Sequence, residues 1–285
     1  MATTALQPPA ATVTQLESTL RAGCRACAVL GWSCVTIPVQ AVLLALGRRR
    51  AATRFGSFYH AVLARCLGLR VTVGGAPRAP HALFVVNHCS YLDIPVFAGA
   101  VPAAFVARHD IAGWPGIGLL AALGRTVYAD RRVARSGQVR DAMRARLAAG
   151  ESLVMFPEGT TNDGVRMLPF RTSLFAAVDV DGPARETLRV QPAVITYLKV
   201  GGLPMPGWLR PTYAWYGDMP LVSHLWRVLK LARVEVRVTF LPAVDPAGFA
   251  DRKVLARHCE AMIGAAYADT RREGLLRRPV TPGQS

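Results

Sequence analysis

Short runs of apolar residues alternate with longer amphipathic stretches between residues 69 and 272. The short runs are rich in β-branched and aromatic residues and end in polar or glycine residues, as buried strands do. Strands are expected at residues 69–73, 83–86, 104–107, 126–128, 153–156, 190–197 and 234–240, and helices at residues 94–99, 116–123, 134–149, 221–231 and 251–272. This alternation predicts an α/β domain over residues 69–272, in which a mixed sheet is flanked by helices.

The N-terminal part follows a different pattern. Residues 1–15 are rich in Ala, Thr, Pro and Gln and are expected to be disordered. Residues 26–47 contain no charged side chain, and about 20 apolar residues are enough to cross a bilayer. We therefore expect residues 16–68 to form a helical membrane anchor, either spanning or re-entrant, with a buried core helix as the alternative. Residues 273–285 are expected to form a loose tail.

The chain is strongly basic, with 34 Lys and Arg residues against 18 Asp and Glu residues. A net charge of +16 suits an anionic lipid surface, a phosphate group or an acidic carrier protein. Nucleic acid is not expected as a partner, because no basic stretch is interleaved with stacking aromatic residues. Arg48, Arg49, Arg50 and Arg54 follow the apolar run. The positive-inside tendency therefore places the catalytic part on the cytoplasmic side of the cell inner membrane.

A candidate general base follows the apolar run at residues 82–86, where the sequence reads Asn-His-x4-Asp from Asn87 to Asp93. Functional groups gather at the carboxyl ends of strands in α/β sheets, and a histidine beside a carboxylate is a simple proton acceptor. Five residues along a regular helix rotate a side chain about 140° away from the first. His88 and Asp93 can therefore meet only if the chain turns between them, with Ser90 as a helix cap. The alternative is a capped helix start with an incidental histidine.

A second motif, Phe-Pro-Glu-Gly-Thr at residues 156–160, follows the strand-like run at residues 152–155. With these two motifs the chain resembles the glycerolipid acyltransferase family, whose members acylate lysophosphatidic acid and related lysolipids. Residues 124–131 and 190–194 resemble two further blocks of that family, in the same order. Thr161 stands where many members of the family have arginine.

The resemblance implies a direct transfer of an acyl group from a thioester to a hydroxyl, without an acyl-enzyme. His88 would be the general base, Asp93 its orienting partner, and Cys89 would point away from His88 and take no covalent part. The donor would be acyl-CoA or an acyl carrier protein, and no cofactor or metal is expected. Arg131 would contact the phosphate of the acceptor, since a guanidinium matches a phosphate bidentately.

The second motif is implied to bind the acceptor lipid. Glu158 cannot bind a phosphate directly, so we expect it to accept a hydrogen bond from a glycerol hydroxyl or to hold a basic residue. Gly159 permits a positive φ or a close backbone approach. Thr160 and Thr161 are expected to donate hydrogen bonds to the acceptor. Two arginines after the motif are further candidates for phosphate contact, namely Arg166 and Arg171.

The acceptor expected from the resemblance is 1-acyl-sn-glycerol-3-phosphate, which would give phosphatidic acid. Lyso-ornithine lipid is the second candidate, because Thr161 and residues 214–219 are similar to members that acylate it. Two other classes of protein stay open at this point. One is a metal-dependent hydrolase that uses His88, Asp93, Glu158 and Asp163, although the chain has only six histidines and no His-x3-His pair. The other is a basic membrane-interaction protein without catalytic activity.

Overall fold

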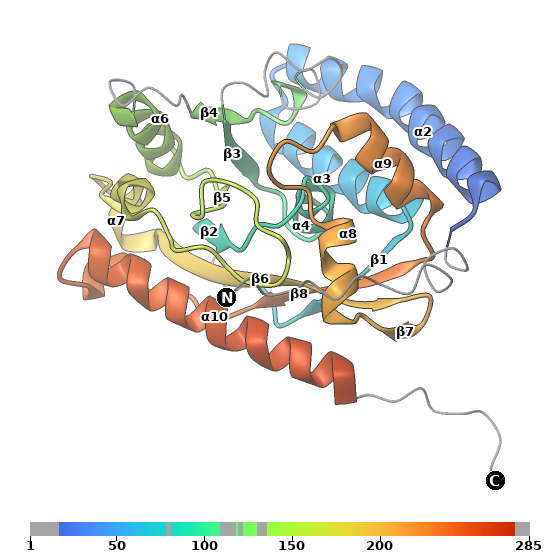
Figure 1. Ribbon diagram of the computed structural model, residues 1–285. Coiled ribbons are helices and arrows are strands. Elements are labelled where there is room, and N and C mark those ends of the chain that lie inside the picture. Colours follow the sequence, from blue (N-terminus) through green and yellow to red (C-terminus); the bar gives the residue numbers. More distant parts are fainter. Residues whose placement is uncertain (1–16, 78–80, 109–117, 119–121, 130–135, 277–285) are drawn as a thin grey trace, which may run out of the picture.

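The structure is a computed structural model, and it describes residues 17–77, 81–108, 118, 122–129 and 136–276. An eight-stranded sheet forms its centre, in the order β1-β8-β6-β2-β5-β3-β4, and β7 pairs with β6 (Figure 1). The strands are β1 (Leu69–Gly74), β2 (Ala82–Val86), β3 (Ala104–Arg108), β4 (Val127–Ala129), β5 (Leu153–Met155), β6 (Arg189–Val200), β7 (Leu203–Pro204) and β8 (Val234–Phe240). The sheet is mixed, as predicted, because β6 runs antiparallel to β7 and β8 while the other neighbouring pairs are parallel.

Helices cover both faces of this sheet (Figure 1). The α-helices are α2 (Thr19–Ala45), α3 (Arg49–Cys66), α4 (Asp93–Ala98), α6 (Ser136–Ala148), α7 (Ala184–Thr187), α8 (Arg210–Tyr213), α9 (Leu221–Lys230) and α10 (Arg252–Leu276), and the 3-10 helices are η3 (Thr172–Val178), η4 (Gly207–Leu209) and η5 (Pro246–Gly248). The seven expected strands are all present, with ends that differ by at most three residues. The helix expected at residues 116–123 and the N-terminal residues 1–15 lie largely or wholly outside the described residues.

The central strand β2 separates two hydrophobic cores. All five of its residues are buried, and because side chains alternate along a strand they enter opposite faces of the sheet. Leu83 and Val85 join the core beneath α6 and α10, whereas Phe84 and Val86 join the core beneath α3, α4 and α9. Burial on both faces is typical of a parallel strand inside a sheet. β2 and β5 are parallel neighbours, so the polar residues that follow them meet at one edge.

The apolar helix α2 lies along the protein surface beside α3 and α9 (Figure 1). Trp32 donates a hydrogen bond to the carbonyl of Tyr59 over 3.1 Å, and Gln40 donates one to the carbonyl of Leu123 over 3.0 Å. Among the described residues, α2 is the one helix long and apolar enough to cross a membrane, and only 11% of its apolar window is buried. This exposure argues against a buried core helix and indicates membrane association.

Asn87 extends the pairing of β2 with β6 beyond the last backbone bridge. Its side-chain amide donates to the carbonyl of Ile195 over 3.0 Å, and its side-chain oxygen accepts from the Ile195 N–H over 2.8 Å. The side-chain amide of Asn87 therefore makes the two hydrogen bonds to Ile195 that the backbone of a further β2 residue would otherwise make. The backbone of β2 itself has already turned away from β6 at this point. This arrangement frees the chain after Asn87 to turn toward Asp93.

Replacing Asn87 with alanine should lower the free energy of unfolding by about 2–4 kcal/mol, because the buried N–H and C=O groups of Ile195 lose their partners. Chemical denaturation of the detergent-purified protein measures this change. Thr53→Ala is the control, since it removes an exposed hydroxyl on α3 and should change the stability by less than about 0.5 kcal/mol. Equal midpoints for the Asn87 variant and the unmodified protein would contradict this assignment.

Candidate active site

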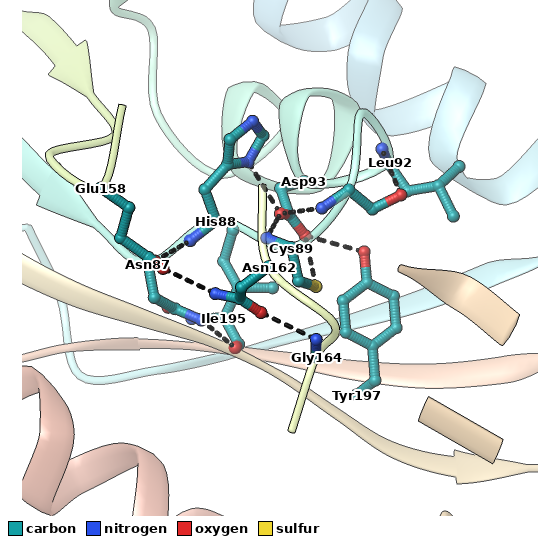
Figure 2. A network of polar contacts seen from close by, with 11 residues as sticks. Asn87, His88, Cys89, Leu92, Asp93, Glu158, Asn162, Gly164, Ile195 and Tyr197 are labelled. Atoms are coloured by element: carbon teal, nitrogen blue, oxygen red, sulfur yellow. Dashed lines mark hydrogen bonds and ion pairs between the residues drawn. The ribbon is translucent and has the colours of Figure 1, made fainter. Parts of the chain in front are cut away.

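The predicted turn between His88 and Asp93 is present at the carboxyl end of β2 (Figure 2). Asp93 donates its N–H to the carbonyl of Ser90 over 3.0 Å, which folds the chain back, and α4 begins at Asp93. The Nδ1 atom of His88 lies 3.0 Å from Oδ2 of Asp93. Since a carboxylate accepts, Nδ1 carries the proton in this contact and Nε2 keeps a free lone pair. Nε2 points away from Asp93, and the His88 side chain is 15% exposed (Figure 2).

The Asp93 carboxylate is fully buried and is surrounded by hydrogen-bond donors. Oδ2 also accepts the backbone N–H groups of Cys89 over 2.7 Å and of Ser90 over 2.9 Å. The prediction that Ser90 caps the helix is wrong, because α4 begins at Asp93 with Leu92 as its N-cap. The Ser90 hydroxyl instead accepts from the N–H of Leu92 over 3.3 Å, within the turn that precedes the helix. Burying a charge without such partners is costly. The donors therefore fix the position of the carboxylate as well as its hydrogen bond to the histidine.

Tyr197 is a member of the site that sequence reasoning missed. Its hydroxyl donates to Oδ1 of Asp93 over 2.8 Å, although it lies on β6, far from Asp93 in the sequence. Burial and the negative charge of Asp93 raise the pKa of Tyr197 well above its usual range, so the hydroxyl stays protonated and remains a donor. The sequence offers only a weak signal, a tyrosine near the end of the apolar run Ala193-Val194-Ile195.

The His88 ring is held on its flat side by Phe156, the first residue of the second motif. The two rings stack with centroids 3.8 Å apart and an angle of 8° between their planes. Phe105 packs against Phe156 in turn, with the two ring centroids 5.9 Å apart. Stacking restricts rotation of the imidazole about its side-chain bonds, so the ring and its carboxylate partner keep a fixed orientation.

Both carboxylate oxygens of Glu158 accept hydrogen bonds from the protein and hold the loop that carries His88. Its carboxylate is only 2% exposed, and Oε1 accepts the backbone N–H of His88 over 2.8 Å. Oε2 accepts from the side chain of Asn162 and from the N–H of Leu168, each over 2.7 Å. Burial raises the pKa of Glu158, and these hydrogen bonds oppose the rise. The expected contact with a glycerol hydroxyl or a basic residue is therefore replaced by contacts with the protein itself.

Gly159 fulfils both expectations for a glycine at this place. Its φ is +71°, and a β-carbon there would lie 2.5 Å from Nε of Arg171. The guanidinium of Arg171 therefore lies directly over the glycine, and its side chain is exposed. Thr160 is exposed beside it and Thr161 is half-buried. The exposed groups at the end of the second motif are thus the Thr160 hydroxyl and the guanidinium of Arg171 over Gly159.

Among the described residues, the remaining candidates from the sequence form no hydrogen bond or ion pair with His88 or Asp93. Arg131 lies outside the described residues. Arg166 is exposed. Asp163 uses Oδ1 to accept the N–H groups of Val165 over 2.8 Å and of Arg166 over 3.2 Å, which closes a turn of the loop. Asp163 is therefore a turn residue in this structure.

Helix α10 braces the loop that carries the second motif. Tyr267 donates its hydroxyl to the carbonyl of Gly164 over 2.7 Å, and Arg271 donates to the carbonyl of Val165 over 2.7 Å. Glu260 accepts the N–H of Phe170 over 3.2 Å. These contacts attach α10 to the loop that follows Glu158.

The ligand set of a metal-dependent hydrolase is not assembled in the described part of the chain, where no group of three or more His, Cys, Asp or Glu residues could hold a metal ion. The carboxylate oxygens of Asp93 and Glu158 point at N–H and O–H donors, and Asp163 closes its own turn. Carboxylate oxygens that accept hydrogen bonds from the protein are not directed at a common point where a metal ion could bind. This arrangement argues against the metal-dependent hydrolase.

Cys89 does not point away from the site, as had been expected from the alternation of a strand. Its sulfur lies 3.8 Å from Oδ1 of Asp93, so Cys89 and His88 contact the same carboxylate (Figure 2). The reason is that the chain has left the strand conformation by this point and is turning. Burial and the nearby charge of Asp93 raise the pKa of the Cys89 thiol well above its usual range. A protonated, buried thiol is a poor nucleophile.

Comparison with known proteins assigns the chain to a family. The family described as "Acyltransferase" matches residues 70–196. The chain is 38% identical to a lyso-ornithine lipid O-acyltransferase of Brucella abortus, over 84% of this chain and 90% of that protein. It is 43% identical to the protein of the same name from Rhizobium meliloti, over 79% of this chain and 78% of that protein.

More distant similarities point to the same group. The chain is 32% identical to a 1-acyl-sn-glycerol-3-phosphate acyltransferase of Neisseria meningitidis, over 78% of this chain and 82% of that protein. The crystal structure of the 1-acyl-sn-glycerophosphate acyltransferase PlsC from Thermotoga maritima shares the fold, with a TM-score of 0.56 and 18% identity over 88% of this chain and 98% of that one. The chain therefore belongs to the acyltransferase family and is an O-acyltransferase of lysolipids.

Proposed function

We propose that His88 is the general base of acyl transfer and that Asp93 orients it and stabilises its protonated form. The hydrogen bond of 3.0 Å between Nδ1 of His88 and Oδ2 of Asp93 carries this proposal, because it leaves Nε2 free to accept a proton. The acceptor hydroxyl gives its proton to Nε2 while its oxygen forms a bond to the thioester carbonyl carbon. The carbon–sulfur bond then breaks, and the leaving thiolate takes the proton from the imidazolium.

The transfer proceeds without a covalent intermediate on the enzyme. The thiol nearest to His88 belongs to Cys89, which is buried and shares its carboxylate contact with the base. The thiolate that leaves belongs to the donor, which is acyl-CoA or an acyl carrier protein. A net charge of +16 suits the phosphates of the first and the acidic surface that such carrier proteins present.

We propose lyso-ornithine lipid as the preferred acceptor, which reverses the order expected from the motifs. Relatives of that name are 38% and 43% identical to this chain, against 32% for one named for 1-acyl-sn-glycerol-3-phosphate. The segment at residues 214–219 borders the catalytic loop, since Trp215 donates its N–H to the carbonyl of Cys89 over 2.8 Å. Lysophosphatidic acid is the second candidate. Thr160, Thr161 and Gly159 lie on the acceptor side in either case.

Two cations are candidates for the headgroup of the acceptor. The guanidinium of Arg171 lies over Gly159 and would match the carboxylate of an acylated ornithine or a phosphate. Arg131 stays a prediction, as the residue that contacts a phosphate-bearing acceptor. A carboxylate carries a smaller charge than a phosphate, so fewer arginines suffice. The threonine at position 161, where many relatives have arginine, agrees with this difference.

We also propose that the enzyme works at the cytoplasmic side of the inner membrane. Arg48, Arg49 and Arg50 follow the apolar helix α2 and would lie among the headgroups of that side. Contacts along α2 support insertion into one leaflet rather than a span, because Trp32 and Gln40 hydrogen-bond to the protein near its middle and its end. A helix that crossed the bilayer would have to give up these contacts.

Replacing His88 with alanine should lower turnover by about 10²–10⁴-fold and leave the fold intact, because a positioned general base contributes about that factor. The measurement is transfer of a labelled acyl group from either donor to lysolipid in mixed micelles. His258→Ala is the matched control, since His258 is exposed on α10. Turnover near that of the control enzyme would refute the assignment of the base.

Replacing Tyr197 with phenylalanine should lower turnover about tenfold with little change in KM. A hydrogen bond to a charged group contributes about 1.5–3 kcal/mol, and the two backbone donors retain part of the orientation. Tyr213→Phe is the matched control, because the buried Tyr213 hydroxyl has no partner among the described residues and the ring stacks on Tyr197. An equal loss in both variants would show that packing, rather than the hydroxyl, is responsible.

The acceptor is tested by offering the purified enzyme lyso-ornithine lipid and lysophosphatidic acid in separate assays, each with both donors. We expect kcat/KM for lyso-ornithine lipid to be at least about tenfold higher, which corresponds to about 1.4 kcal/mol of discrimination. A higher value for lysophosphatidic acid would overturn the acceptor assignment and leave the role of His88 untouched.

A further inference from the structure

An arginine-lined cavity lies away from the catalytic loop, where the N-terminal end of α2 meets the C-terminal end of α9 and the first residues of β1 and β8. Its volume is about 560 Å³, and four arginines line it, namely Arg21, Arg25, Arg70 and Arg233. Glu235 is the one carboxylate among its lining residues in the described part of the chain. Neither His88 nor any other residue of the catalytic loop contributes to this wall.

Two of the arginines have a structural task. Arg25 donates to the carbonyls of Leu229 over 3.1 Å and Leu231 over 2.8 Å, and Arg21 donates to the carbonyl of Lys230 over 3.0 Å. Both therefore cap the C-terminal end of α9, where the helix dipole favours a cation. Burial and the charge of Arg21 lower the pKa of Arg25. Like charges are thus crowded together at this end of the cavity.

The other two arginines have no such task. Arg70 and Arg233 are exposed and form no ion pair with any part of the chain that the structure describes. The carboxylate of Glu235 lies opposite Arg70 across the strands, but its ion pair is with Lys199, at 3.8 Å. Arg70 and Arg233 therefore bring positive charge to the cavity that no carboxylate of the described residues pairs with. An anion with several oxygens would satisfy these guanidinium groups, and phosphate fits their planar geometry.

Exposed apolar side chains lie next to the lining residues in the sequence and further along α9. Leu20 directly precedes Arg21 and is 79% exposed, and Leu203 follows the glycines of the cavity wall and is 59% exposed. On α9, Val222 is 81% exposed and Trp226 is 41% exposed, on the side opposite the buried His224. The apolar helix α2 lies next to α9 and continues this surface (Figure 1). A tryptophan on an apolar surface next to cations is typical of a membrane interface.

We propose that this cavity binds the phosphate of an anionic membrane phospholipid, whose acyl chains lie along α2 and α9. The pairing of a cationic cavity with an apolar border favours a lipid over a soluble phosphate compound, which would need only the charge. The bound lipid would hold α9 against the bilayer surface, next to the membrane contact that α2 makes. The inference rests on the membrane association of the chain and is independent of the acceptor and of the catalytic residues.

The test measures binding of dioleoyl phosphatidylglycerol to the full-length, detergent-purified protein by native mass spectrometry and by thermal shift. No acyl donor is present, so acyl transfer does not contribute. We expect binding to phosphatidylglycerol but not to phosphatidylcholine, and a fall in affinity with rising salt. The double variant Arg70→Gln/Arg233→Gln should bind about 10- to 30-fold more weakly, because each arginine near a lipid surface contributes about a factor of five.

The matched control is Arg185→Gln/Arg257→Gln, which removes the same charge from exposed positions on α7 and α10. If both double variants weaken binding equally, net charge is responsible and the cavity assignment fails. Inorganic phosphate or coenzyme A that displaces the lipid completely at millimolar concentration would assign the cavity to a soluble phosphate group instead. Arg70→Gln alone guards against misfolding, since this side chain is exposed; unchanged lipid binding by a folded Arg70 variant and a folded double variant would overturn the proposal.

Discussion

Burying the carboxylate of Asp93 is unfavourable unless donors surround it, and the fold supplies them from separate segments. Two backbone N–H groups come from the turn after β2, and the hydroxyl of Tyr197 comes from β6. The carboxylate also accepts a hydrogen bond from the imidazole of His88. Any change in the order or register of β2 and β6 would remove a donor from a buried charge. The sheet therefore specifies the geometry of the His88–Asp93 pair, because the buried charge needs all of these donors.

A second buried carboxylate holds the same histidine by its backbone. Glu158 accepts the His88 N–H and also joins Asn162 and Leu168, so the two motifs are parts of one hydrogen-bonded unit. The imidazole is oriented by Asp93 on one edge and by the ring of Phe156 on its face. If His88 is the base, as proposed, this fixed orientation means that it loses little freedom when the acceptor binds, which is how positioning contributes to rate.

The apolar helix α2, which is long enough to cross a membrane, packs against the amphipathic helix α9. Arginine side chains of α2 cap the end of α9, so the apolar helix and the amphipathic helix are one structural unit. The opposite face of α9 reaches the catalytic loop, because Tyr91 hydrogen-bonds to His224 over 3.0 Å. Helix α9 therefore lies between the exposed apolar helix α2 and the loop that carries His88.

Local patterns in the sequence were enough to predict much of the fold and of the candidate site. Apolar runs located the strands, the positive-φ glycine at position 159 followed from its motif, and the five-residue spacing required a turn between His88 and Asp93. These features depend on residues that are close in the chain. The limits of prediction appear where a partner is distant: Cys89 was assigned to the wrong side, because a strand pattern cannot say where the backbone starts to turn.

Only the tertiary structure decided which distant groups meet. Tyr197 reaches Asp93 and Asn87 pairs with Ile195 because β6 lies next to β2, an order that no local pattern encodes. Glu158 was expected to bind the acceptor, but in the structure it is buried and accepts the N–H groups of His88 and Leu168. The sequence by itself determined which chemical groups the site contains. The packing of the sheet decided which carboxylate orients the base and which one holds the loop, since a buried charge takes the donors that the fold brings to it.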